Sequence, residues 1–424
     1  MISLGDKLSR FVGGGPATPR VDHDSDGALR SNARPLGHAR DGLPPARESL
    51  KGALERLPSP LRSGHTEPAL PLDWGAGPLL TLGEAIPGRA VSTLHGSTWL
   101  GESAHLPSER HGLVAFESAH EADYRHLERM TGDARLGGFD PRRALFLDIE
   151  ATGLEHGAGT LAFLVGLGFF EGDLLRVEQV LLREADEEAA LLERVWQAVL
   201  RFDYLVSFNG KSFDLSVLQN RMVMHRMCSR ETAALKLRPH LDLLHVSRSV
   251  FKGVWPDVRL QTLEREVLGF HREDDMPGAL APLCWFTWLR DADARPLAGI
   301  ARHNRMDVLS MVVLAAVLAR EAEPRPDAGR RSRVALNLAR LYLRRKAPSA
   351  TLTVLADRPP LMDHEERMAA LELVATASRR VGDFDAQVGA LAELLALAPE
   401  RADVEKALTR ARTRARLVGD RRRD

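Results

Sequence analysis

Residues 144–154 read ALFLDIEATGL, an apolar run that leads into two closely spaced acids. The segment from Ala144 to Ile149 has the composition of a strand that is buried on both faces of a sheet. Side chains two positions apart on a strand share one face, so Asp148 and Glu150 project toward the same point. Hard divalent cations bind such oxygen ligands, although two solvated acids at a strand end would give the same pattern. The stretch predicts a central strand and marks a candidate site.

The segments after this strand alternate between strand-like and helical patterns. The turn sequence Glu171-Gly172-Asp173 separates two apolar runs, as in a hairpin. The expected strands cover residues 160–170, 174–182 and 204–208, and the expected helices cover residues 187–202 and 213–227. Three strands in succession, followed by alternating helices and strands, predict an α/β fold with a mixed sheet.

Two smaller features are predicted upstream of the central strand. Residues 89–116 contain strand-like runs around a Gly turn, which favours a small hairpin. Residues 118–130 have helical spacing, and Ser118 and Glu121 stand at the spacing of a capping box. We therefore expect one helix that begins at Ser118 and ends near Met130.

Composition divides the chain into four parts. The first is rich in Pro, Gly, Arg and Ser and lacks the apolar residues that offset ordering entropy, so we predict that it is largely disordered. In the last part, Arg344-Arg345 recurs as Arg379-Arg380 after 35 residues, close to the period of about 34 in tetratricopeptide helix pairs. A generic helical hairpin domain fits this pattern equally well. The expected parts are residues 1–88 (disordered), 89–322 (α/β), 323–331 (linker) and 332–424 (helical, with a basic tail).

Charge and cysteine content narrow the class of protein. The 58 basic and 58 acidic residues give a net charge of zero, which argues neither for nor against a nucleic-acid partner. Cys228 and Cys284 are the two cysteines, and their separation excludes a disulfide scaffold or a zinc knuckle. The N-terminal stretch has no apolar run of signal-peptide length, and no apolar run reaches the roughly 20 residues that span a bilayer. We expect a soluble, cytoplasmic protein without a membrane partner.

Two further groups of residues carry candidate chemistry. Asp214 opens a predicted helix, where an acid also simply favours the helix N-terminus. His303 and Asp307 are four apart in a helical pattern and share one face, as an ordinary surface pair would. With the first pair of acids, they supply four carboxylates and a base. Two-metal phosphoryl-transfer sites need such a set.

The acids and the segments around them resemble the DEDD (DnaQ-like) 3′–5′ exonuclease superfamily of the ribonuclease-H fold. More closely, the chain is similar to the YprB-type branch of ribonuclease-H-like proteins, in which tetratricopeptide-like tails occur. The resemblance covers about residues 90–320 and rests on the blocks FLDIEATGL, GAGTLAFLVGLGFFEGD, LVSFNGKSFDLSVLQNR, HLDLLHVSR, LQTLEREVLGFHREDDMPG and HNRMDVLSM. It implies a ribonuclease-H-like mixed sheet flanked by helices over residues 89–322, joined to an all-α C-terminal helical domain.

The resemblance also implies roles for individual residues. The catalytic ligands of two Mg²⁺ or Mn²⁺ ions are expected to be Asp148, Glu150, Asp214 and Asp307. His303 occupies the position of the general base. Members with a His usually place it five residues before the last acid, whereas the gap here is four, as in members with a Tyr. The expected substrate contacts are Thr152, Leu154, Asn209 and Lys211.

The expected activity is hydrolysis of phosphodiester bonds by a metal-dependent 3′–5′ exonuclease acting on single-stranded DNA or RNA. Two alternatives stay open. One is a non-catalytic module on the same fold that binds nucleic acid or protein, because the helical C-terminal region can recruit a protein partner. The other is a structure-selective endonuclease, which the same metal site would support. For Asn209 and Lys211, turn geometry and solvation are a further alternative to substrate contact.

Overall fold

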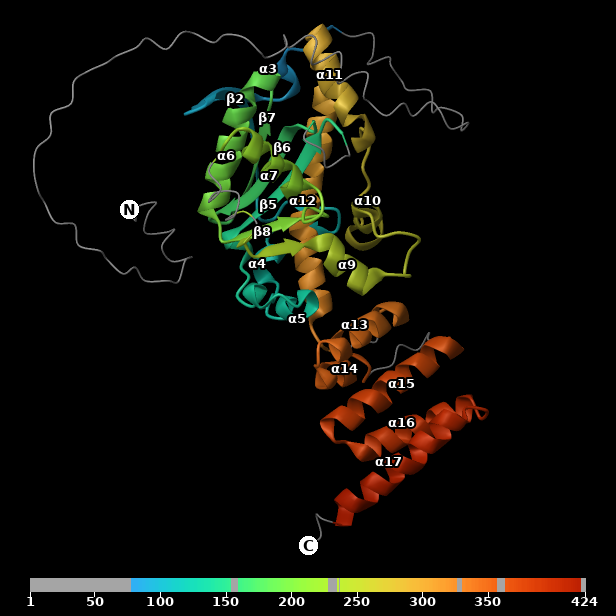
Figure 1. The fold of residues 1–424 in the computed structure, drawn as a ribbon. Coiled ribbons are helices and arrows are strands. Elements are labelled where there is room, and N and C mark those ends of the chain that lie inside the picture. The colour runs from blue at the N-terminus through green and yellow to red at the C-terminus, as the bar shows by residue number, and fades with distance from the viewer. Residues whose placement is uncertain are drawn as a thin grey trace, which may run out of the picture. The chain divides into compact units, whose positions relative to one another are not determined.

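A seven-stranded sheet forms the centre of the computed structural model, which describes residues 78–153, 159–227, 235, 237–325, 330–356 and 363–420 (Figure 1). The strand order is β1-β2-β7-β6-β5-β8-β9. The strands are β1 (Gly88–Thr93), β2 (Gly96–His105), β5 (Ala144–Ala151), β6 (Ala162–Glu171), β7 (Leu174–Leu181), β8 (Tyr204–Ser207) and β9 (His240–Asp242). Strands β5, β8 and β9 run parallel to one another, and the other neighbours are antiparallel. The predicted mixed sheet is confirmed.

Strand β5 lies inside the sheet, between β6 and β8, as its continuous apolar run predicts. Phe146 and Leu147 of this strand are buried, one on each face. The predicted hairpin of β6 and β7 is also present. Its turn contains Gly172, whose φ of 62° lies in the left-handed region that glycine adopts without strain.

Helices cover both faces of the sheet. Helix α6 (Glu188–Arg201) packs on β2, β6 and β7, and the long helix α12 (Arg295–Ala322) crosses β5, β6 and β7 (Figure 1). Phe169 of β6 packs against Phe202, which follows α6, whereas Gly168 faces Val308 of α12. Alternate residues of a strand point to opposite faces, so α6 and α12 lie on opposite sides of the sheet. The other helices of this region are α3 (Leu82–Ala85), α4 (Ser118–Glu121), α5 (Leu127–Thr131), α7 (Asp214–Met224), α9 (Leu243–Phe251), α10 (Leu260–Leu263) and α11 (Ala281–Asp291).

The N-terminal part of this region differs from its prediction. Order begins before residue 89, because α3 and β1 start earlier, and residues 1–77 of the predicted disordered segment lie outside the described residues. The predicted hairpin is present as β1 and β2, and β2 also pairs with β7, so the hairpin extends the main sheet. The short strands β3 (Arg110–His111) and β4 (Val114–Ala115) pair only with each other.

The prediction of one helix over residues 118–130 was wrong. Two short helices, α4 and α5, stand there instead. The hydroxyl group of Ser118 donates to the carbonyl of Ala115 rather than capping a helix, and the N–H of Arg125 bonds to the side chain of Asp123. Such local side-chain bonds compete with the helical pattern and interrupt it.

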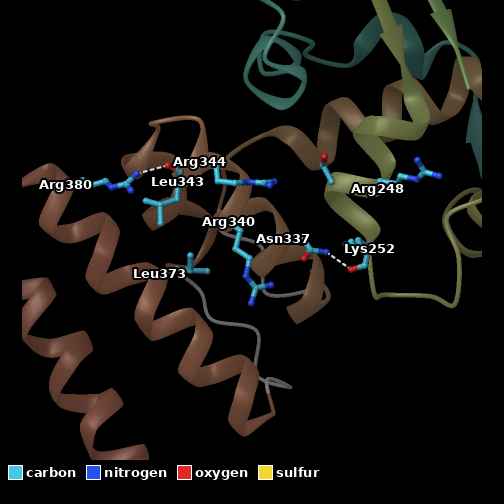
Figure 2. Close-up of a pocket in the computed structure, with 9 residues that line it drawn as sticks. Arg248, Lys252, Asn337, Arg340, Leu343, Arg344, Leu373 and Arg380 are labelled. Carbon is cyan, nitrogen blue, oxygen red and sulfur yellow. Dashed lines mark hydrogen bonds between the residues drawn. The ribbon is translucent and has the colours of Figure 1, made fainter. Parts of the chain in front are cut away.

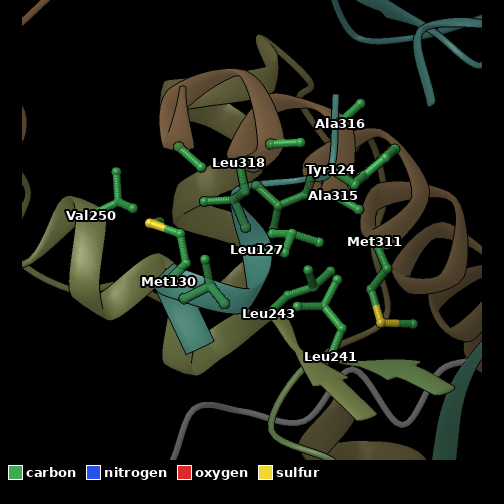
Figure 3. Packing of buried hydrophobic residues seen from close by; sticks show 14 of the residues in the cluster. Tyr124, Leu127, Met130, Leu241, Leu243, Val250, Met311, Ala315, Ala316 and Leu318 are labelled. Carbon is green, nitrogen blue, oxygen red and sulfur yellow. The ribbon is translucent and has the colours of Figure 1, made fainter. Parts of the chain in front are cut away.

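The main hydrophobic core continues from the sheet into the C-terminal helices. Met311, Ala315 and Leu318 of α12 share this core with Leu127 of α5 and Leu243 of α9 (Figure 3). Helices α13 (Ser332–Arg344) and α14 (Pro348–Val354) add their apolar faces to it. Helices α15 (His364–Val381), α16 (Phe384–Leu397) and α17 (Ala402–Asp420) surround a second, smaller core. The predicted helical C-terminal region is confirmed. Within the described residues, no helix has the length and apolar content to cross a membrane.

Candidate active site

Three elements bring the predicted acids to one end of β5. Strand β5 carries Asp148 and Glu150, and its parallel neighbour β8 leads through a short turn into α7, whose first residue is Asp214. Helix α12 crosses the same part of the sheet and carries His303 and Asp307. Parallel strands end at the same edge of a sheet, so residues at and just beyond their carboxyl ends come together there.

The charges of these acids act on one another. Burial raises the pKa of Asp148 well above its usual range, and the charges of the other three acids raise it further. Burial and the charges of Asp307 and Asp214 also raise the pKa of Glu150. For Asp214, burial and then the charge of Asp242 raise the pKa to about 8. The four acids therefore interact, and the ionised forms of Asp148, Glu150 and Asp214 are disfavoured by the charges of the neighbouring acids.

Two amide side chains fix the orientation of Asp148. Nδ2 of Asn304 on α12 donates a 2.8 Å hydrogen bond to Oδ2 of Asp148 and approaches its backbone oxygen at 3.3 Å. Nε2 of Gln179 on β7 donates to Oδ1 of Asn304 at 2.9 Å and to the carbonyl of Ala301 at 2.7 Å. The buried Asn304 amide thus has both ends satisfied. Its donation to Asp148 counters part of the rise in that residue's pKa.

Two glycines of β6 allow α12 to approach the sheet at this point. Gly166 is the register partner of Asp148 on the neighbouring strand. A Cβ atom at Gly166 would overlap the side-chain oxygen of Asn304, and a Cβ atom at Gly168 would overlap a methyl group of Val308. The absence of side chains at both positions makes the contact between α12 and the acid-bearing strand possible.

A buried arginine binds the other side of the acid cluster. Arg272 lies between α10 and α11, and its guanidinium group donates to both carboxylate oxygens of Glu264, at 2.7 and 2.6 Å. It also donates to Oδ1 of Asp307. Burial opposes the charge on Arg272, but its hydrogen bonds to Glu264 and the charge of Asp307 outweigh this effect and raise the pKa of the guanidinium group. Arg272 therefore neutralises part of the cluster and restrains Asp307.

His303 stands between two carboxylates. Its Nδ1 lies 2.9 Å from Oδ1 of Asp275, and its Nε2 lies 3.7 Å from Oδ2 of Asp307. Nη1 of Arg272 reaches the other oxygen of Asp275 at 3.3 Å, so N–H groups from two residues converge on that carboxylate. Nη1 of Arg272 also lies 3.1 Å from Nδ1 of His303, so a carboxylate and a guanidinium group meet at this ring nitrogen.

The turn between β8 and α7 is held by Asp242 of β9. Its carboxylate accepts hydrogen bonds from the backbone N–H groups of Asn209 and Lys211, at 2.9 and 3.1 Å, and from that of Leu244 at 3.1 Å. The φ of Asn209 is 72°, a left-handed value that asparagine tolerates better than most residues. Asp242 therefore shapes the turn and caps α9.

A cleft of about 840 Å³ opens beside the acid cluster. Of the predicted catalytic residues, Asp148, His303 and Asp307 line this cleft, whereas Glu150 and Asp214 are buried and do not. Three exposed cations also line it, namely Arg248, Lys252 and Arg259.

The four predicted substrate contacts have different environments. Asn209 lines the cleft. The hydroxyl group of Thr152 accepts a 3.0 Å bond from the N–H of Leu161, which ties it to the neighbouring strand. The side chain of Lys211 is exposed and is not among the cleft-lining residues. Leu154 lies outside the described residues. Substrate contact stays a prediction for all four.

The donor set of the cluster fits a hard divalent cation, although the side chains are not already arranged around one. Within the described residues, no group of three or more His, Cys, Asp or Glu side chains has the spacing of a metal site. Asn304 binds one carboxylate oxygen of Asp148, and Arg272 binds one carboxylate oxygen of Asp307. The donors themselves are carboxyl groups whose pKa values are raised by burial and by neighbouring acids, and a divalent cation such as Mg²⁺ or Mn²⁺ would favour their ionised forms.

Five residues that contact this cluster were not predicted from the sequence, namely Gln179, Glu264, Arg272, Asp275 and Asn304. Asn304 carried a signal, because it shares a buried helix face with Val308, and a polar residue on such a face needs a partner. The sequence around Arg272 contains no motif that marks it as buried.

Comparison with known proteins agrees with the fold. Residues 145–319 match the model of a family in the RNase_H superfamily. The uncharacterized protein YprB of Bacillus subtilis (strain 168) is 34% identical over 208 residues, which are 49% of this chain and 49% of that protein. The matched region thus spans about half the length of the relative. With the seven-stranded mixed sheet and its flanking helices, these matches support a ribonuclease-H-like protein with a helical C-terminal region.

Proposed function

We propose that the protein is a metal-dependent 3′–5′ exonuclease that hydrolyses single-stranded DNA or RNA. The observation that carries the proposal is the group of interacting acids at the end of β5, beside His303 in the wall of a cleft. A ribonuclease-H-like fold suggests nucleic-acid binding, and the three exposed cations of the cleft suit a phosphodiester backbone. The exonucleolytic action and its polarity rest on the family resemblance.

The ligands of the divalent ions would be Asp148, Glu150, Asp214 and Asp307. Mg²⁺ or Mn²⁺ bound there would supply a Lewis acid for the scissile phosphate. Asn304 keeps one oxygen of Asp148 directed toward α12, and the other carboxylate oxygen stays available for a ligand. The shared burial of Glu150 and Asp214 keeps water away from the charged groups and strengthens their interactions.

His303 acts as the general base in this proposal. Its Nε2 accepts a proton from the attacking water, and the carboxylate of Asp275 at Nδ1 stabilises the imidazolium that forms. The four-residue spacing to Asp307 brings Nε2 to 3.7 Å from that carboxylate, so base and metal ligand stand on the same side of α12. Arg272 acts as a positioning residue, because it contacts both Asp275 and Asp307.

Hydrolysis assays with labelled oligonucleotides test the proposal. Linear single-stranded DNA and RNA, each blocked at the 5′ or the 3′ end, are incubated with the full chain and Mn²⁺ or Mg²⁺. We expect release of mononucleotides from a free 3′ end, loss of the activity in EDTA, and loss in Asp148→Asn. The matched control is Glu117→Gln, because Glu117 is an exposed acid outside the cleft.

Each contrary result leads to a different conclusion about the protein. Activity that survives EDTA or Asp148→Asn rejects the proposed site. Cleavage of a circular single strand identifies an endonuclease, since a circle has no end. Oligonucleotide binding without turnover under any divalent metal identifies a non-catalytic module. The contact of Arg272 with Asp307 is consistent with that outcome, because a cationic side chain already binds one of the proposed metal ligands.

A further inference from the structure

A second hollow, of about 520 Å³, lies where α9 meets α13 and α15 (Figure 2). Five of its lining residues are cations: Arg248, Lys252, Arg340, Arg344 and Arg380. None of the described residues that line it is acidic. The chain as a whole has equal numbers of acids and bases, so this hollow is a local segregation of positive charge.

The cations of the hollow lack the partners that neutralise other arginines nearby. Within the described part of the chain, Arg248, Lys252, Arg340 and Arg344 form no ion pair. Three other arginines of the helical region, by contrast, are paired with acids: Arg333 with Glu366, Arg367 with Glu393, and Arg401 with Glu372 and Asp403. Like charges gathered in a hollow repel one another unless an anion joins them, so the arrangement favours an anionic ligand.

The position of these cations is fixed by the packing of the helices. Nδ2 of Asn337 on α13 donates to the backbone oxygens of Val250 and Lys252, at 3.0 and 2.9 Å, and so binds α13 to the end of α9 (Figure 2). Nη1 of Arg380 donates to the carbonyl of Leu343 at 2.7 Å, which links α15 to α13. The helices that carry the cations are therefore held together before a ligand binds.

The hollow is continuous with the cleft of the active site. Arg248 and Lys252 line both. We propose that the hollow binds the sugar–phosphate backbone of a single strand whose end occupies the cleft. The proposal rests on the proposed nuclease function for the identity of the ligand. Leu343 and Leu373 supply apolar surface for sugar rings, and the arginines pair with phosphate groups. The helical region is then part of the substrate site, and activity favours strands long enough to reach it.

Binding measured without hydrolysis tests this proposal. The full chain is titrated in EDTA into fluorescein-labelled oligothymidylate and oligouridylate of 30 nucleotides, and anisotropy is recorded over a range of salt concentrations. The test variant is Arg340→Gln/Arg344→Gln. The matched control, Arg412→Gln/Arg416→Gln, makes the same charge change at two exposed arginines of α17.

The slope of log affinity against log salt should be shallower by about 1.4 in the test variant. Each phosphate contact to a single strand contributes roughly 0.7 to this slope, and the variant removes two such contacts. We expect its affinity at 0.1 M salt to fall by about tenfold or more. The control variant should bind as the wild type does. A purely structural role would change affinity without changing the slope, and a melting curve of each variant verifies its fold.

The outcomes separate this proposal from the nuclease function. An unchanged slope and affinity in Arg340→Gln/Arg344→Gln overturns the proposal, whatever the hydrolysis assay shows. An equal loss in the control variant also overturns it, since general charge would then explain binding. A polyglutamate peptide that binds the hollow more tightly than the oligonucleotides do points to an acidic protein instead and rejects it. If the salt slope falls in Arg340→Gln/Arg344→Gln but the wild type hydrolyses no substrate, the result supports nucleic-acid binding in the hollow and rejects only the nuclease function.

Discussion

Asn304 of α12 holds Asp148 of β5 through a 2.8 Å hydrogen bond that joins a helix to the sheet strand below it. The bond links the packing of the fold to the geometry of the proposed site. Gln179 fixes the Asn304 amide from the other side, and Gly166 leaves the room that the amide needs. One carboxylate of the cluster thus depends on three strands and one helix being correctly packed.

Replacing Asn304 tests the role of this bond. In Asn304→Ala, Asp148 loses its side-chain donor and Gln179 loses one of its two acceptors, and we expect kcat to fall about 10- to 100-fold. Unfolding free energy should fall by about 1–3 kcal/mol. Asn304→Asp keeps the shape but adds a negative charge, so its activity should be lower still. Urea denaturation and steady-state hydrolysis measure both effects, with the exposed Gln197→Ala as control. Wild-type activity in Asn304→Asp would reject the donor role.

Gly166→Ala should destabilise the protein and lower activity together. The added methyl group overlaps the side-chain oxygen of Asn304, so α12 must move away from β6. Overpacking of this kind costs roughly 1–3 kcal/mol. Gly389→Ala is the control, because Gly389 lies in α16 with open space around it and alanine favours a helix by up to about 1 kcal/mol. Equal melting temperatures for the two variants would contradict the close approach of α12.

Local patterns predicted β5 and several of the elements that pack around it. The buried run of β5, the hairpin of β6 and β7, and the amphipathic α6 each depend on residues close together in the sequence. The pairing of β2 with β7 was not predictable in this way. His105 pairs with Leu175, and nothing in either local pattern specifies the other. Long-range pairing is decided by the packing of the whole sheet.

The site shows the same division between local motif and tertiary context. Asp148 and Glu150 were found because their spacing on a strand has chemical meaning by itself. Arg272 was missed because its role depends on Glu264, which begins a π-helical turn, and on Asp307 from another element. A short charged stretch reads as a solvated loop until the fold buries it.

Arg272→Met should destabilise the metal-free protein strongly. Glu264 would keep its buried charge without its partner, and breaking a buried pair in this way costs roughly 3–5 kcal/mol. The variant also frees Asp307 for another cation, so Mn²⁺ should raise its melting temperature by more than it raises that of the wild type. Arg89→Met, at an exposed pair, should change little. Calorimetry in EDTA and in Mn²⁺ measures these shifts, and an identical Mn²⁺ response in both proteins would argue against the role of Arg272.

The stability of the metal-free protein should fall as pH rises from about 6.5 to about 8. A carboxyl group whose folded pKa is raised gives stability that is fully present below its unfolded pKa of about 4 and is lost as pH rises through the folded value. For Asp214 that value is about 8. His111 and His240 have the opposite effect, because burial lowers the pKa of each to about 4, but their contribution changes only below the unfolded pKa of about 6.5. Above pH 6.5, the pH dependence of the unfolding free energy therefore reports on the buried acids and not on these two histidines.

Urea denaturation in EDTA between pH 6.5 and 8 measures the effect. The free energy of unfolding should fall by roughly 1 kcal/mol per pH unit for each acid that is protonated in the folded state and releases its proton on unfolding. Asp214→Asn should flatten the profile, because the amide does not titrate. Mn²⁺ should reverse the trend in the wild type, since metal binding needs ionised carboxylates and strengthens as protons leave. The prediction would be wrong if the unfolding free energy of the metal-free protein rose with pH, or if Asp214→Asn left its pH dependence unchanged. Either result would show that burial and neighbouring acids do not raise the pKa of Asp214.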